Sequence, residues 1–289
     1  MTSLASIEEV VHFPCGSVRL WGIVSRPGPS IAASETAVLI VVGGPQYRVG
    51  SHRQFVLLAR ALAAAGHPTL RFDYTGMGDS DGPLRTFEQA GPDLHAALNA
   101  LADACPGARR IVVWGLCDAA SAALMFAGDD PRVVGIVAAN PWARSAATLA
   151  ATHLKHYYAA RLLQPEFWRK LAHGGLRWGE SLRSLRASLA ARMARSTADA
   201  DRHVAFQVAM AAGLKQLQGR LLLILSGNDL TAREFVEYTA SSSAWRGLLQ
   251  GPKVTRMDLP EADHTFSQRP WLDRVSAESI AWLQQFSHT

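Results

Sequence analysis

Short apolar runs alternate along the chain with longer segments in which apolar residues recur every three or four positions. A continuous apolar run, such as AVLIVV at 37–42, is typical of a strand buried on both faces of a sheet. Wider spacing, as at Phe55, Leu58, Ala59 and Leu62, is typical of a helix with one buried face. This alternation predicts a largely parallel sheet with helices on both faces.

The predicted elements cover most of the chain. We expect strands over 10–14, 18–25, 37–42, 69–72, 110–114, 133–139, 220–225 and 253–257. We expect helices over 52–65, 86–104, 119–127 and 276–286. Only Cys15-Gly16-Ser17 separates the first two strands, so we expect them to form an antiparallel pair.

Residues 143–219 interrupt this pattern, because they carry no strand signal. A helical seam formed by Leu182, Leu185, Leu189 and Met193 predicts a helical cap inserted into a core made of 1–142 and 220–289. The insert holds twelve lysines and arginines against four acidic residues, a net +8, and since the whole chain is +5 the rest carries −3. A basic cap would attract anionic ligands, and a solvated helical face would have the same composition.

The composition of the chain excludes several classes of protein. A chain of 289 residues that is 48% hydrophobic can bury a core without disulfides or metals. Its three cysteines (Cys15, Cys105 and Cys117) lie far apart, which excludes a disulfide framework and a zinc site. No apolar run approaches the roughly 18 residues of a membrane helix, and no lysine or arginine precedes Arg19, unlike in a signal peptide. We therefore expect a cytoplasmic protein without a transmembrane segment.

The sharpest chemical signal is WGLCDAA at 114–120. An apolar strand leads into Gly115, then Cys117, then small residues that begin a helix, which is the context of a nucleophile elbow with Cys in place of Ser. The tight turn strains the nucleophile's backbone, so its neighbours two positions away must be small. The helix N-terminus favours a thiolate. Cys117 is the candidate nucleophile, and the alternative is an ordinary buried thiol.

A literal G-x-S-x-G sequence at 78–82 is a weaker candidate. Pro83 follows it directly, so no helix can begin there. We interpret 73–82 as a loop that leaves a strand and do not expect Ser80 to be a nucleophile.

An acid and a base follow later strands in the order that such a site requires. Asp229 comes after the strand RLLLIL, and His264 comes after KVTRM. With Cys117 they form a candidate triad of nucleophile, acid and histidine. Glu261 and Asp263 are weaker acids, because neighbours of a histidine seldom reach its far ring nitrogen.

The oxyanion donors come from two backbone positions. Asp118 supplies the N–H next to the nucleophile, and the loop at 43–47 supplies the second, with Gly44 as first choice and Gln46 as second. Pro45 has no N–H to donate. No Gly-Lys-Ser/Thr follows this loop, which excludes a phosphate loop.

Metals, cofactors and nucleic acid are not expected. His153 and His156 lie three apart on a predicted cap helix but lack a third ligand, so we predict no metal site and no cofactor. No nucleic-acid-binding motif accompanies the basic insert.

Several segments resemble the type 1 hydrolases associated with the exosortase A system, which are bacterial α/β-hydrolase-fold proteins encoded with exopolysaccharide and protein-sorting systems. The resemblance lies in VVGGPQYRVGSHRQFVLLARALAAAG, WGLCDAASAAL, LKHYY, LLQPEFWRKL, LILSGNDLTAREF and LPEADHTFS. It implies an α/β-hydrolase fold, with the triad on Cys117, Asp229 and His264. Dienelactone hydrolases are similar in placing Cys at the elbow, whereas many serine hydrolases have His-Gly where this chain has Gly43-Gly44.

The expected reaction is covalent acyl transfer on an ester, lactone or thioester. The expected substrate is a small molecule or a carrier-linked acyl group. The basic cap would favour such a substrate if it were anionic. Two alternatives remain open. An acyltransferase would use a sugar or carrier acceptor in place of water, and a binding protein would keep the fold without turnover. Labelling of Cys117 by an activity probe, with and without His264, separates catalysis from binding.

Overall fold

The computed structural model describes residues 5–44, 46–144 and 206–286. The chain divides into two compact units, one of residues 1–143 and 208–289 and the other of residues 144–207. The first unit is almost completely described. The predicted cap helices, the seam from Leu182 to Met193 and the His153–His156 pair lie outside the described residues.

Eight strands form one sheet in the order β1-β2-β4-β3-β5-β6-β7-β8. Its first two pairings, β1 with β2 and β2 with β4, are antiparallel, and the remaining five are parallel. The strands are β1 (Ser6–Cys15), β2 (Val18–Pro27), β3 (Thr36–Val41), β4 (Thr69–Phe72), β5 (Arg110–Leu116), β6 (Val133–Ala139), β7 (Arg220–Asn228) and β8 (Val254–Asp263). The largely parallel sheet predicted from the alternation is confirmed, and so is the α/β-hydrolase fold that the resemblance implied.

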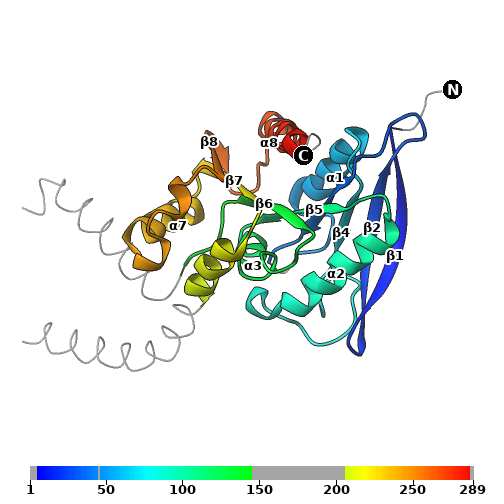
Figure 1. Ribbon diagram of the computed structural model, residues 1–289, viewed down its shortest axis with the longest axis horizontal. Coiled ribbons are helices and arrows are strands. Elements are labelled where there is room, and N and C mark those ends of the chain that lie inside the picture. Colours follow the sequence, from blue (N-terminus) through cyan, green and yellow to red (C-terminus); the bar gives the residue numbers. More distant parts are fainter. Residues whose placement is uncertain (1–4, 45, 145–205, 287–289) are drawn as a thin grey trace, which may run out of the picture. The chain divides into compact units, whose positions relative to one another are not determined.

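Helices cover both faces of the sheet (Figure 1). They are α1 (Gln54–Ala64), α2 (Gly91–Ala104), α3 (Asp118–Phe126), α7 (Leu230–Ser241) and α8 (Arg269–Leu283). Helices α1 and α8 pack together on one face, and α2 and α3 pack together on the other. Helix α8 begins before its predicted range, and α7 has no predicted range of its own, since its apolar face is short.

One hydrophobic cluster of the core lies where the central parallel strands meet α1 and α8. Every residue of β3 is buried, as its continuous apolar run predicts. The Phe55 ring of α1 lies 6.0 Å from the ring of Trp114 on β5, in an edge-to-face arrangement. The Trp114 indole N–H donates to Ser279 Oγ of α8 at 3.3 Å. These contacts hold β5, whose end carries the candidate nucleophile, between neighbouring elements.

A helix over 206–216 packs against α3. A Cβ atom at Gly213 would lie 2.1 Å from the carbonyl oxygen of Leu124, so only glycine allows this approach. Residues 208–219 therefore pack with the first unit, whereas the predicted insert extended to 219. A cap over 145–205 stays a prediction.

Candidate active site

The three predicted catalytic residues each stand directly after a strand. Cys117 follows β5, Asp229 follows β7 and His264 follows β8. Asn228 and Asp263, which precede the acid and the base, are paired in the parallel register of β7 and β8. The register therefore brings Asp229 and His264 side by side.

Cys117 occupies a strained turn between β5 and α3. Its backbone has φ 63° and ψ −127°, a conformation that costs a non-glycine residue about 1–3 kcal/mol. Its carbonyl oxygen accepts hydrogen bonds from the N–H groups of Ser121 and Trp142, each at 3.2 Å. A Cβ atom at Gly115 would lie 2.7 Å from the Ala119 backbone. The small residues that the sequence places around the cysteine are thus required by the turn.

Exposure separates Cys117 from the other two cysteines. Cys117 is half-buried, whereas Cys15 and Cys105 are buried. Burial raises the pKa of the Cys15 thiol and of the Cys105 thiol. Cys117 is therefore the one cysteine with access to a substrate.

His264 is held by Asp229. Its Nδ1 lies 2.7 Å from Asp229 Oδ2. The hydrogen bond to Asp229, followed by one to the Cys117 side chain, raises the pKa of His264 to about 10. The Asp229 carboxylate also accepts from the N–H groups of Thr231 at 2.9 Å and Ala232 at 3.3 Å, so the acid is at once the N-cap of α7 and the partner of the histidine.

The other carboxylates near His264 have different partners. Asp263 accepts from the N–H of Thr265 at 3.2 Å, from the N–H of Ser267 at 2.9 Å and from the Ser267 hydroxyl. It therefore shapes the loop that carries the base. Glu261 is exposed, and its carbonyl oxygen accepts from the Asn228 amide at 3.0 Å.

Asn140, which the sequence analysis missed, joins the segments that carry the acid and the base. It is fully buried directly after β6 and has φ 44°. Its amide nitrogen donates to Ser226 Oγ at 2.9 Å and to the carbonyl oxygen of His264 at 3.0 Å. Its oxygen accepts from the N–H of Ser226 at 2.8 Å. An asparagine that directly follows a buried apolar strand was the available signal.

Ser80 performs a structural task. Its hydroxyl donates to the carbonyl oxygen of Asp73 at 2.8 Å and accepts from the N–H of Trp21 at 3.0 Å. The first bond lies within the loop after β4, and the second joins that loop to β2.

The predicted oxyanion donors of the loop after β3 both have internal partners. The N–H of Gly44 donates to the carboxylate of Asp118, at 2.7 Å from Oδ1 and 2.9 Å from Oδ2. The N–H of Gln46 donates to the carbonyl oxygen of Gly44 at 2.7 Å. The choice of Gly44 first and Gln46 second stays a prediction.

A buried ion pair anchors this loop to the next one. The Arg48 guanidinium pairs with Asp73, which directly follows β4, and Arg48 Nη2 lies 2.7 Å from Asp79. The N–H of Arg48 also donates to Asp73 Oδ1 at 2.6 Å. Arg48 and Asp73 are buried, so this anchor is shielded from solvent. The sequence analysis had no signal for this pair.

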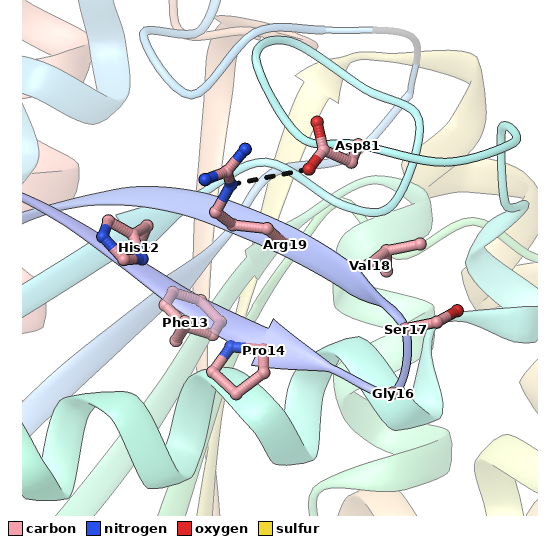
Figure 2. Close-up of a pocket in the computed structure, with 8 residues that line it drawn as sticks. All are labelled: His12, Phe13, Pro14, Gly16, Ser17, Val18, Arg19 and Asp81. Carbon is pink, nitrogen blue, oxygen red and sulfur yellow. Dashed lines mark ion pairs between the residues drawn. The ribbon is translucent and has the colours of Figure 1, made fainter.

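A hollow of about 390 Å³ lies at the β1–β2 hairpin. Figure 2 shows that Arg19 and Asp81 pair across it, at 3.5 Å. None of the predicted catalytic residues lines this hollow, so it is separate from the candidate active site. Within 5–44, 46–144 and 206–286, no group of three metal-binding side chains occurs, and no helix is long and apolar enough to cross a membrane.

Comparison with known proteins assigns the chain to a family. The profile of the alpha/beta hydrolase family matches residues 38–277. A search of curated proteins gives no match. The esterase Pf2001 of Pyrococcus furiosus has a similar structure, with 18% identity, a TM-score of 0.64 and coverage of 98% of this chain and 94% of that chain.

Two further solved structures share the fold. An α/β serine hydrolase without a lid from Xanthomonas campestris, XC6422, has 14% identity, a TM-score of 0.57 and coverage of 100% of this chain and 97% of its own. A dienelactone hydrolase from Anabaena variabilis has 16% identity, a TM-score of 0.59 and coverage of 97% of this chain and 98% of its own. With eight strands in the described sheet and a family match over most of its length, the chain belongs to the alpha/beta hydrolase family.

Proposed function

We propose that the protein hydrolyses esters, lactones or thioesters through a covalent acyl intermediate on Cys117. The observation that carries this proposal is the arrangement of Cys117, His264 and Asp229 at the ends of β5, β8 and β7, in which His264 Nδ1 lies 2.7 Å from Asp229 Oδ2 and the side chain of Cys117 acts on the pKa of the same histidine. A thiol in a strained elbow, a histidine beside it and a buried carboxylate behind the histidine are the parts of a nucleophilic triad.

The proposed first half-reaction forms the acyl-enzyme. The raised pKa of His264 favours its imidazolium form, and in the proposed mechanism the proton that it carries comes from the Cys117 thiol. The Sγ atom attacks the carbonyl carbon, the C–S bond forms, and the carbonyl electron pair moves onto oxygen. The N–H groups of Asp118 and Gly44 would stabilise that oxyanion, each worth about 2.7–4 kcal/mol in comparable sites. The carbonyl is restored, the bond to the leaving group breaks, and His264 gives its proton to that group.

The second half-reaction releases the acid. Neutral His264 takes a proton from water, whose oxygen attacks the acyl carbon. The C–S bond then breaks and Cys117 leaves as the thiolate. Asp229 keeps the imidazole in one orientation and stabilises its charged form throughout. The amine of an amide leaves less readily than the alcohol of an ester or the thiol of a thioester, so we expect activated carbonyls to be preferred.

The setting of the reaction rests on motif resemblance alone. We propose a cytoplasmic role beside exopolysaccharide and exosortase systems, with a small-molecule or carrier-linked acyl substrate. The basic insert would favour an anionic substrate, and its residues 145–205 lie outside the described residues. If it guides such a substrate, kcat/KM for an anionic thioester should fall between about 50 and 300 mM salt while a neutral ester does not respond.

Hydrolysis of p-nitrophenyl acetate and of an acetyl thioester tests the proposal. Cys117→Ala should abolish turnover with the fold intact, Cys117→Ser should retain a small residue of it, and His264→Ala should lose most of it. Cys105→Ser and Ser80→Ala are matched controls that should keep wild-type rates. Full activity of Cys117→Ala, or loss of activity in folded Ser80→Ala, would refute the proposed nucleophile.

A further inference from the structure

The carboxylate of Asp118 occupies the backbone donor that an oxyanion would need. Asp118 is the residue directly after Cys117, and Gly44 lies 74 positions earlier in the loop after β3. Both carboxylate oxygens lie within hydrogen-bonding distance of the Gly44 nitrogen, at 2.7 and 2.9 Å. The N–H groups of Ala119 and of Asp118 itself also interact with this carboxylate. The two N–H groups proposed as oxyanion donors, those of Gly44 and Asp118, thus face one anion that belongs to the protein.

The loop is shaped for this arrangement. A Cβ atom at Gly43 would lie 2.1 Å from Asp118 Oδ1 and 2.7 Å from the carbonyl oxygen of Leu116. Any other side chain at position 43 would therefore collide with the carboxylate or move it. Gly43 stands where many serine hydrolases have histidine. A glycine at this position leaves room for the carboxylate of Asp118, the residue that follows the nucleophile.

The charges around Asp118 leave the carboxylate available to move. Burial raises the pKa of Asp118, and the N–H groups of Gly44, Ala119 and Asp118 act in the opposite direction. His264 is the charged side chain that favours its ionised form. No lysine or arginine forms an ion pair with Asp118 in the part of the chain that the structure describes. Backbone hydrogen bonds hold it, and such bonds are exchanged at small net cost.

We propose that Asp118 competes with the reacting carbonyl oxygen for the Gly44 N–H, and that rotation of its carboxylate off Gly44 limits the acylation of Cys117. This inference rests on the proposed function, since it assigns the Gly44 N–H to the oxyanion. Two negative oxygens cannot share one donor in a buried site, because their repulsion is weakly screened there. In the resting protein the Asp118 carboxylate therefore takes the place of the oxyanion at the Gly44 N–H, and each acylation must displace it from there.

Two reactions of Cys117 separate this competition from a general effect on the thiol. Acylation by p-nitrophenyl acetate develops an oxyanion. Alkylation by iodoacetamide forms a C–S bond at a saturated carbon, expels iodide and develops none. Removal of a nearby negative charge changes the thiolate fraction equally for both reactions. The ratio of the acylation rate constant to the alkylation rate constant therefore reports the oxyanion donors alone.

The experiment measures this ratio by stopped-flow release of p-nitrophenol and by mass spectrometry of alkylated Cys117. In Asp118→Ala the ratio should rise about tenfold, since one freed oxyanion donor is worth up to 10²–10³ in comparable sites. In Asp118→Asn, which keeps the shape and should keep the fold, it should rise less, because the neutral amide oxygen still accepts from Gly44. Asp81→Asn removes one exposed charge, which pairs with Arg19, from the loop after β4 without touching Gly44 or Arg48, and it should leave the ratio unchanged.

Three results would overturn the inference. A ratio that is unchanged in both Asp118 variants would mean that the carboxylate does not compete. A ratio that falls in both would make Asp118 a support for the donors. Acylation of Cys117 in neither the wild type nor the variants would refute the proposed function itself, which distinguishes that failure from the first two.

Discussion

His264 Nδ1 lies 2.7 Å from Asp229 Oδ2, and both residues immediately follow a register pair of neighbouring strands, Asn228 of β7 and Asp263 of β8. The register of β7 and β8 brings the two side chains into contact, because a shift of one residue in that register would separate them. The same carboxylate caps α7. Its two tasks can be separated by substitution.

Asp229→Asn should keep the cap and lose the catalytic orientation. Asparagine is as good an N-cap as aspartate, so the helix cap should be kept, and the stability that is lost should be the part that depends on charged His264, which disappears as the pH rises to about 10. The neutral amide cannot stabilise an imidazolium, and kcat should fall by about 10⁴-fold, as in comparable triads. Asp229→Ala should lose activity and, in addition, about 1 kcal/mol of stability. Urea unfolding and steady-state rates measure both effects, and an active Asp229→Asn enzyme would remove Asp229 from the triad.

The pH dependence of stability should carry a contribution from His264. Its pKa is raised to about 10 in the folded protein, whereas an unfolded chain releases this proton near 6.5. The native state therefore holds more protons between these values, so this contribution is complete below about pH 6.5 and is lost as the pH rises to about 10. The difference in unfolding free energy between wild type and His264→Ala should be largest below about pH 6.5 and should shrink as the pH rises to about 10. A difference that is constant across this range would contradict the raised pKa.

The thiol of Cys117 should react with iodoacetamide at pH 6–7 before Cys15 and Cys105 do. The pKa values of those two thiols are raised by burial, and a thiol beside an imidazolium is reactive at lower pH. His264→Ala should slow the labelling of Cys117 and leave the other two unchanged. Peptide mapping after partial alkylation gives the order, and equal labelling of all three cysteines would argue against an activated thiol.

Asn140→Ala should lower both stability and activity. The substitution leaves the N–H of Ser226 and the carbonyl oxygen of His264 without their buried partner, which costs about 1–3 kcal/mol for each such group. Asn99→Ala is the matched control, because Asn99 accepts only an exposed bond from Arg132. Its effect should stay within about 0.5 kcal/mol. A silent Asn140→Ala would show that the loop of His264 is held without it.

Arg48→Ala should be strongly destabilising, because it leaves the buried Asp73 carboxylate without its cation. Loss of one partner of a buried ion pair costs about 3–5 kcal/mol. Arg60→Ala removes an exposed pair with Glu8 and should cost about 0–1 kcal/mol. Equal effects on urea unfolding would mean that the buried pair is not the anchor of the loop.

The sequence predicted those features that depend on local order along the chain. Apolar runs predicted the strands, and strand ends predicted Cys117, Asp229 and His264. Features that depend on contacts between distant segments were not predictable in this way. The bonds of Asn140 span 86 and 124 positions, and those of Arg48 to Asp73 span 25. The contact between Gly44 and Asp118 also depends on a side-chain orientation, which no spacing encodes.

Acid-quench mass spectrometry of the acyl-enzyme tests the central claim most directly. The protein is mixed with p-nitrophenyl acetate for milliseconds, quenched in acid and digested, and the acetyl group is located on the peptides. The triad predicts a transient acetyl thioester on Cys117 that persists longer in His264→Ala, because deacylation is slowed there. Turnover without any adduct on Cys117, or an adduct on Ser80, would contradict it.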